Sequence, residues 1–138
     1  MIGPAIYREW VLAAVLLSLP GCGGGDAFAP PACTAPVELL VGTGTAPSFE
    51  WPGCAAAGLG VEALDGSGQV MWSVLTVGTQ NTLQSPVRYG QRPASPPVFT
   101  DPAQPLVAGT RYLVTLFTAE SAASGPTLSE IARQEFVP

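Results

Sequence analysis

The sequence predicts an all-β protein in which about seven short antiparallel strands pack as a two-sheet sandwich. Short segments that alternate apolar and polar residues, rich in β-branched and aromatic side chains, recur along the chain and are typical of strands. The 138 residues include 16 glycines and 15 prolines, which favour turns between these segments and leave little room for long helices. Apolar residues make up 47% of the chain, which is enough for the core of a single domain.

The amino-terminal segment is typical of an export signal. Residues 10–19, WVLAAVLLSL, are apolar, but a membrane-spanning helix needs about 20 such residues. A run of this length that ends at Pro20 and Gly21 fits the hydrophobic core of a signal peptide. We therefore predict that residues 1–21 are removed during export, the alternative being an uncleaved helix at the membrane interface.

The residues that end this segment resemble the lipobox of bacterial lipoproteins. Leu19, Gly21 and Cys22 stand at the positions that this family motif uses. The resemblance implies lipid attachment at Cys22 and stable anchoring, because three acyl chains hold a protein far more firmly than one. Gly23 stands where an aspartate retains relatives at the inner membrane, so the outer membrane is favoured if the cell is Gram-negative. The alternative is an ordinary secretory signal in which Cys22 carries no lipid.

The segment that follows is expected to be a spacer. Residues 22–36 are rich in glycine and proline and nearly uncharged, and we predict that they tether the domain to the membrane. The folded domain is then expected to cover residues 37–138. A domain of about 100 residues can bury its own core, with a stability on the order of 5–10 kcal/mol.

Cys33 and Cys54 are predicted to form a disulfide. They are the two cysteines left after Cys22 is assigned to lipid, and an even pair in an exported protein favours a bridge. The strands expected at residues 37–41 and 48–51 would form a hairpin that brings the two cysteines together at its open end. The closed loop of about 20 residues would contribute roughly 3 kcal/mol to stability. The alternative is a pair of free, buried thiols.

The remaining strands follow between turn signals. Residues 65–68, Asp-Gly-Ser-Gly, predict a hairpin turn. Residues 91–105 hold five prolines, so pairing there is expected at a sheet edge or not at all, and the strand order over residues 85–105 stays open. Residues 121–129 are expected to be a loop, and a helix that begins at Ser129 competes with the last strand. The strands are expected at residues 59–64, 69–77, 86–90, 111–119 and 131–138.

The segment PLVAGTRYLVTL at residues 105–116 resembles the sixth-strand signature of fibronectin type III domains. The matching residues are Leu106, Gly109, Thr110, Tyr112, Val114 and Leu116. The resemblance covers about residues 36–138 and implies a tyrosine corner, in which the Tyr112 hydroxyl bonds to backbone upstream. Trp51 resembles the core tryptophan of the family's second strand. The expected core is Phe49, Trp51, Val61, Val74, Tyr112, Val114, Leu116 and Phe136.

Three of the aromatic residues outside this expected core are candidates for a binding surface. Trp72, Tyr89 and Phe99 could stack on a sugar ring or dock a protein if they were exposed together. The strand at residues 69–77 is apolar on both faces, so it is either covered on two sides or exposes a patch. The alternative is that Trp72 fills the second face of its strand and the other two cover an edge.

The sequence offers no constellation for catalysis or metal binding. It contains no histidine, so the commonest general base is missing and a Ser-His-Asp or Cys-His arrangement is excluded. Glu50, Glu62 and Asp65 are interpreted as solvent-facing carboxylates, with a carboxylate pair for glycoside hydrolysis as the alternative. The net charge is −5 and the arginines form no cluster, which argues against nucleic-acid binding. We expect no catalytic residue, metal or cofactor.

These features together imply a membrane-anchored lipoprotein of the cell envelope. The fibronectin type III resemblance implies a non-enzymatic interaction or scaffold module, with an envelope protein or polysaccharide as partner. The alternative is a carbohydrate- or peptide-binding lipoprotein that uses exposed Trp72 and Tyr89. A third hypothesis, an enzyme, would need a pocket in which two carboxylates converge.

Overall fold

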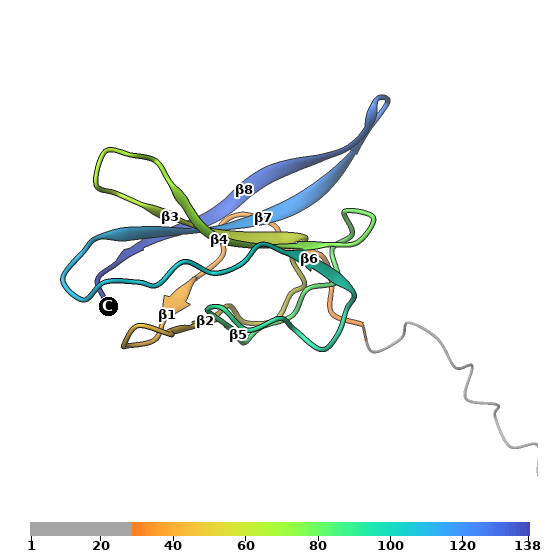
Figure 1. Ribbon diagram of the computed structural model, residues 1–138. Coiled ribbons are helices and arrows are strands. Elements are labelled where there is room, and N and C mark those ends of the chain that lie inside the picture. Colours follow the sequence, from red (N-terminus) through yellow and green to blue (C-terminus); the bar gives the residue numbers. More distant parts are fainter. Residues whose placement is uncertain (1–28) are drawn as a thin grey trace, which may run out of the picture.

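The computed structural model describes residues 29–138, which form eight β-strands in two sheets (Figure 1). The prediction of an all-β fold with two packed sheets is confirmed, with eight strands in place of about seven. The described residues include no helix that is long and apolar enough to cross a membrane. The signal peptide predicted at residues 1–21 and the lipid attachment at Cys22 lie outside the described residues.

The strands pair antiparallel throughout, in a three-stranded sheet of order β1-β2-β5 and a five-stranded sheet of order β6-β4-β3-β7-β8. Figure 1 shows the two sheets as separate layers, with β1, β2 and β5 below the larger sheet. The strands are β1 (Leu40–Val41), β2 (Ser48–Glu50), β3 (Gly58–Ala63), β4 (Val70–Thr76), β5 (Val87–Arg88), β6 (Val98–Thr100), β7 (Tyr112–Ala122) and β8 (Gly125–Phe136).

The first hairpin joins β1 to β2 and is closed by the predicted disulfide. Cys33 and Cys54 are bonded, with their Cα atoms 4.8 Å apart, at the open end of this hairpin. Cys33 also donates its backbone N–H to the Ala55 carbonyl, and Ala55 donates its own N–H to the Pro31 carbonyl. The folded unit therefore includes residues 31–33, which the sequence had assigned to the tether.

The turn between β3 and β4 forms where the Asp-Gly-Ser-Gly motif predicts it. Ser67 donates its backbone N–H and its hydroxyl to the Asp65 carboxylate, and these bonds lower the pKa of Asp65. Gly66 and Gly68 adopt positive φ values of 90° and 63°, which glycine reaches without steric cost. The carboxylate is therefore used by the turn itself.

The loop predicted at residues 121–129 is wrong. β7 and β8 pair continuously as far as Ala122 and Gly125, so this stretch is a two-stranded ribbon that extends beyond the other strands in Figure 1. Its residues are mostly small or polar because neither face is covered, and apolar alternation could not reveal it. Backbone pairing alone sets its structure. The competing helix at Ser129 is absent as well, since Ser129 lies within β8.

Asn81 binds the β7 backbone at the point where this ribbon leaves the sheet. The last β3–β7 pair is Gly58 with Phe117. Beyond it, the Asn81 amide donates to the Ala119 carbonyl (2.9 Å) and accepts from the Ala119 backbone N–H (2.8 Å). A side chain thus makes the two hydrogen bonds that a neighbouring strand would otherwise provide.

The core lies between the two sheets. Seven of the eight predicted core residues are buried, and Phe136 is half-buried and packs against this core. Its ring lies 5.8 Å from the rings of both Phe49 and Tyr112. The Tyr112 hydroxyl accepts a hydrogen bond of 2.9 Å from the backbone N–H of Val107, so the expected bond to upstream backbone is present.

Candidate functional site

The outer face of the five-stranded sheet is the face turned away from the β1-β2-β5 sheet. The strand registers arrange its outward side chains in three rows that run across the strands. The first row is Phe99, Leu75, Gly58, Phe117 and Glu130; the second is Ser73, Gly60, Thr115 and Arg133; the third is Val70, Glu62, Leu113 and Glu135.

A groove of about 540 Å³ follows the central strand of this face. It lies over Gly60, which leaves the second row without a side chain at its centre. The walls come from β4, through Val70, and from β7, through Leu113 and Phe117. We call this feature the Gly60 groove.

The two glycines differ in what the fold requires of them. A Cβ atom at Gly58 would lie 2.9 Å from the Val74 carbonyl oxygen, a distance that real Cβ atoms essentially never show. A Cβ atom at Gly60 would meet only the Phe117 ring, at 3.8 Å, which is ordinary contact, and Gly60 does not have a positive φ. Glycine inside a strand lowers stability relative to alanine. Packing therefore explains Gly58, whereas neither packing nor backbone conformation explains Gly60.

Apolar side chains reach solvent on this face. Val70 is 58% exposed and Phe99, at the β6 edge, is 62% exposed. Leu75 pairs with Phe99 and is half-buried. The apolar pattern of residues 69–77 had left two outcomes open, and the outward side of β4 exposes part of a patch.

The charged groups around the groove are mostly acidic. Arg133 bonds through both Nε and Nη2 to the Glu130 carboxylate, which lowers the pKa of Glu130. Arg111 forms an exposed ion pair of 2.6 Å with Glu135 in the third row. Both pairs are exposed, so each contributes little to stability.

Among the residues that line the groove, Glu62 and Asp101 are the two carboxylates that form no salt bridge with an arginine. Glu62 lies on β3, two residues from Gly60. Asp101 follows β6 and accepts a 2.8 Å hydrogen bond from the Ser73 hydroxyl. The groove therefore combines apolar walls with the hydroxyls of Ser73 and Thr115 beside Gly60, a carboxylate on the central strand and another on the β6 side.

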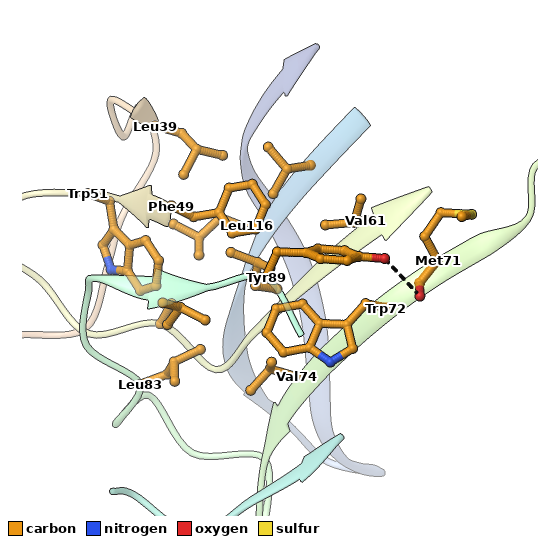
Figure 2. Close-up of a cluster of buried hydrophobic side chains, with 14 of the residues drawn as sticks. Leu39, Phe49, Trp51, Val61, Met71, Trp72, Val74, Leu83, Tyr89 and Leu116 are labelled. Atoms are coloured by element: carbon orange, nitrogen blue, oxygen red, sulfur yellow. Dashed lines mark hydrogen bonds between the residues drawn. The ribbon is translucent and has the colours of Figure 1, made fainter. Parts of the chain in front are cut away.

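Trp72 and Tyr89 do not form an exposed binding pair, and this prediction is corrected. Their side chains are only 2% and 7% exposed, and their rings meet edge to face at 5.3 Å inside the core (Figure 2). The Tyr89 hydroxyl donates to the Gln104 carbonyl at 2.6 Å, and the Met71 carbonyl lies 3.2 Å away. Burial raises the pKa of Tyr89 to about 12. These two aromatics join the sheets and are not available to a ligand.

The alternation of side chains along β4 already indicated that Trp72 is buried. Trp72 and Val74 are two residues apart, so they share a face, and Val74 was already expected in the core. A bulge opposite Val61 and Glu62 then leaves Met71 between the paired positions and turns Val70 outward. The exposed apolar residue of this strand is therefore Val70 and not Trp72.

The three carboxylates singled out in the sequence are not brought together. Glu50 lies on β2 in the other sheet, Asp65 belongs to its turn, and only Glu62 lies in the groove. Within residues 29–138, no group of three or more His, Cys, Asp or Glu side chains is placed to hold a metal ion. Gly60 was not predicted as a site residue, although a glycine in the middle of an apolar strand was an available signal.

Comparison with known proteins finds no family model, no curated protein and no solved structure that matches this chain.

Proposed function

We propose that this chain is a lipid-anchored protein of the cell envelope whose β-sandwich is a non-enzymatic, fibronectin type III-like interaction module. The lipobox-like ending at Leu19, Gly21 and Cys22 supports the anchor. Gly23 supports the outer membrane over the inner membrane in a Gram-negative cell. The partner is an envelope protein that docks on the outer face of the five-stranded sheet.

Two features support the fibronectin type III-like assignment. The first, second and fifth strands share one sheet and the third, seventh and eighth share the other, as strands A, B, E and C, F, G do in immunoglobulin-like sandwiches. The Tyr112 hydroxyl bonds to backbone five residues upstream, near the start of β7, as a tyrosine corner does. β6 is then an added edge strand in the connection between β5 and β7.

The observation that carries the proposed interaction is the Gly60 groove. Contact surfaces of proteins combine apolar and polar groups. The groove has apolar walls at Val70, Leu113 and Phe117, Glu62 on its central strand and Asp101 on the β6 side. Nothing in the fold accounts for the missing side chain at Gly60, and a strand glycine often marks a place where another group approaches closely.

The anchor is tested by growing cells with an alkyne fatty acid and detecting the label on the protein. We expect label on the wild-type chain and none on Cys22→Ser, whose export signal is otherwise unchanged. An unlabelled wild-type protein, or equal labelling of the variant, would contradict the lipoprotein assignment.

The contact face is tested by placing a photoreactive side chain at Val70 and, as a matched control, at Leu128. Both residues are exposed, at 58% and 45%, but Leu128 lies on the ribbon and does not line the groove. In intact envelopes we expect a discrete crosslinked species from Val70 and none of the same size from Leu128. Equal crosslinking from both positions, or none from Val70, would contradict an interaction at this face.

A further inference from the structure

We propose that the Gly60 groove binds an arginine or lysine side chain that the protein partner presents. This inference rests on the proposed interaction function and names the chemistry that the groove recognises.

The shape of the groove suits a long, unbranched side chain. β4 and β7 flank β3 directly on its two sides, so the backbones of β4 and β7 lie roughly 9–10 Å from each other. With no side chain at Gly60, this space is open between the outward residues of the two flanking strands. The volume of about 540 Å³ holds such a side chain together with part of the backbone that carries it.

The interior of the groove matches the apolar part of that side chain. Lysine and arginine lay their methylene stems on apolar surfaces while they keep the charged head in water. Val70, Leu113 and Phe117 provide such a surface around Gly60. The Phe117 ring also adds an attraction for a nearby cation.

The charges of the groove favour a cation over an anion. Its lining holds three carboxylates, those of Glu62, Asp101 and Glu130, against the one guanidinium of Arg133. Arg133 is already held by Glu130 through two hydrogen bonds. Glu62 interacts with Arg133 electrostatically but forms no salt bridge with it, and Asp101 has no arginine partner, so both remain to receive an incoming cation. An acidic peptide or acidic polysaccharide would meet like charge.

The test is a titration of the isotope-labelled, purified protein with small blocked amino acids, followed by two-dimensional NMR. The probes are the N-acetyl methylamides of arginine and lysine, with those of norleucine and glutamate as controls. We expect saturable shifts at the backbone amides of Gly60, Glu62 and Leu113 for the two cations only.

Three variants assign the site. Glu62→Gln should weaken binding by about ten-fold, because a hydrogen bond to a charged group is replaced by a neutral one. Glu120→Gln, which removes an exposed carboxylate from the ribbon, should leave binding unchanged. Gly60→Val should abolish binding and keep a native spectrum, because a Cβ at Gly60 meets only the Phe117 ring, at 3.8 Å, and valine is favoured in strands.

Four results would overturn the inference: no saturable shift with either cation, equal shifts with norleucine or glutamate, undiminished binding in Gly60→Val, or a dimer in sedimentation that Gly60→Val dissociates. The last result would make a second copy of the chain the occupant. Crosslinking from Val70 in intact envelopes is independent of this titration. If it persists while the cations fail to bind, the contact face stands and only its cationic chemistry is wrong.

Discussion

Alanine at Gly58 and alanine at Gly60 should change stability in opposite directions, although the two glycines are two residues apart on the same face of β3. At Gly60 the new methyl group meets only the Phe117 ring, at 3.8 Å, so the variant keeps the native packing. Replacing a strand glycine by alanine then stabilises by about 0.5–1 kcal/mol, chiefly because the unfolded chain loses freedom.

At Gly58 the same methyl group would lie 2.9 Å from the Val74 carbonyl and 3.3 Å from Leu75 Cδ1. The carbonyl belongs to the neighbouring strand of the sheet, so β3 and β4 must shift. Overpacking of this kind costs about 1–3 kcal/mol, which exceeds the entropic gain. The two variants should therefore differ by on the order of 2 kcal/mol in their free energy of unfolding.

The assay is urea unfolding of both variants with the Cys33–Cys54 disulfide intact, followed by tryptophan fluorescence. The slope of unfolding free energy against urea should match the wild type, so that midpoints report stability directly. An equal loss of stability in Gly60→Ala and Gly58→Ala would contradict this prediction. That result would mean that the fold itself requires both glycines.

Three further predictions follow from the core and the disulfide. Tyr112→Phe should lower the free energy of unfolding by about 1–2 kcal/mol, measured in urea, because the Val107 N–H loses its acceptor. An unchanged urea midpoint would show that this hydrogen bond does not stabilise the fold. Tyr89 has a folded pKa of about 12, against 10.0 for an ordinary tyrosine, so its neutral form stabilises the fold below pH 10 and this contribution is lost between pH 10 and 12. The stability of Tyr89→Phe should therefore depend less on pH in this range than that of the wild type. Identical curves of unfolding free energy against pH would contradict the burial of Tyr89. Replacing Cys33 and Cys54 together by alanine should cost roughly 3 kcal/mol, and chemical reduction of the wild type should cost the same; a stable reduced protein would show that the bridge is dispensable.

The sequence predicted the parts of this fold whose signals are local. The hairpin of β1 and β2 follows from two short apolar runs around a Gly-rich turn, and the hairpin placed Cys33 beside Cys54. The prolines of residues 91–105 predicted pairing at a sheet edge or none at all, and β6 lies at the edge of its sheet. In each case the signal and the structure that it sets lie within a few residues of each other.

The parts that the sequence did not predict depend on the absence of side-chain signals or on pairing across strands. The β7–β8 ribbon has no buried face, so no apolar pattern marks it. The bulge in β4 changes which of its apolar residues points outward, and this depends on the register with β3. The Gly60 groove arises only when β4 and β7 flank β3. The alternation of apolar and polar residues along the chain does not predict this strand order.

The most direct test of the account combines stability and contact in one variant. Gly60→Val is introduced into the protein that carries the photoreactive side chain at Val70, and both the urea midpoint and the crosslink yield in intact envelopes are measured. Filling the groove should leave the midpoint at or above that of the parent protein while the crosslinked species disappears. An undiminished crosslink in a folded variant would contradict the claim that this face of the sheet receives a partner at Gly60.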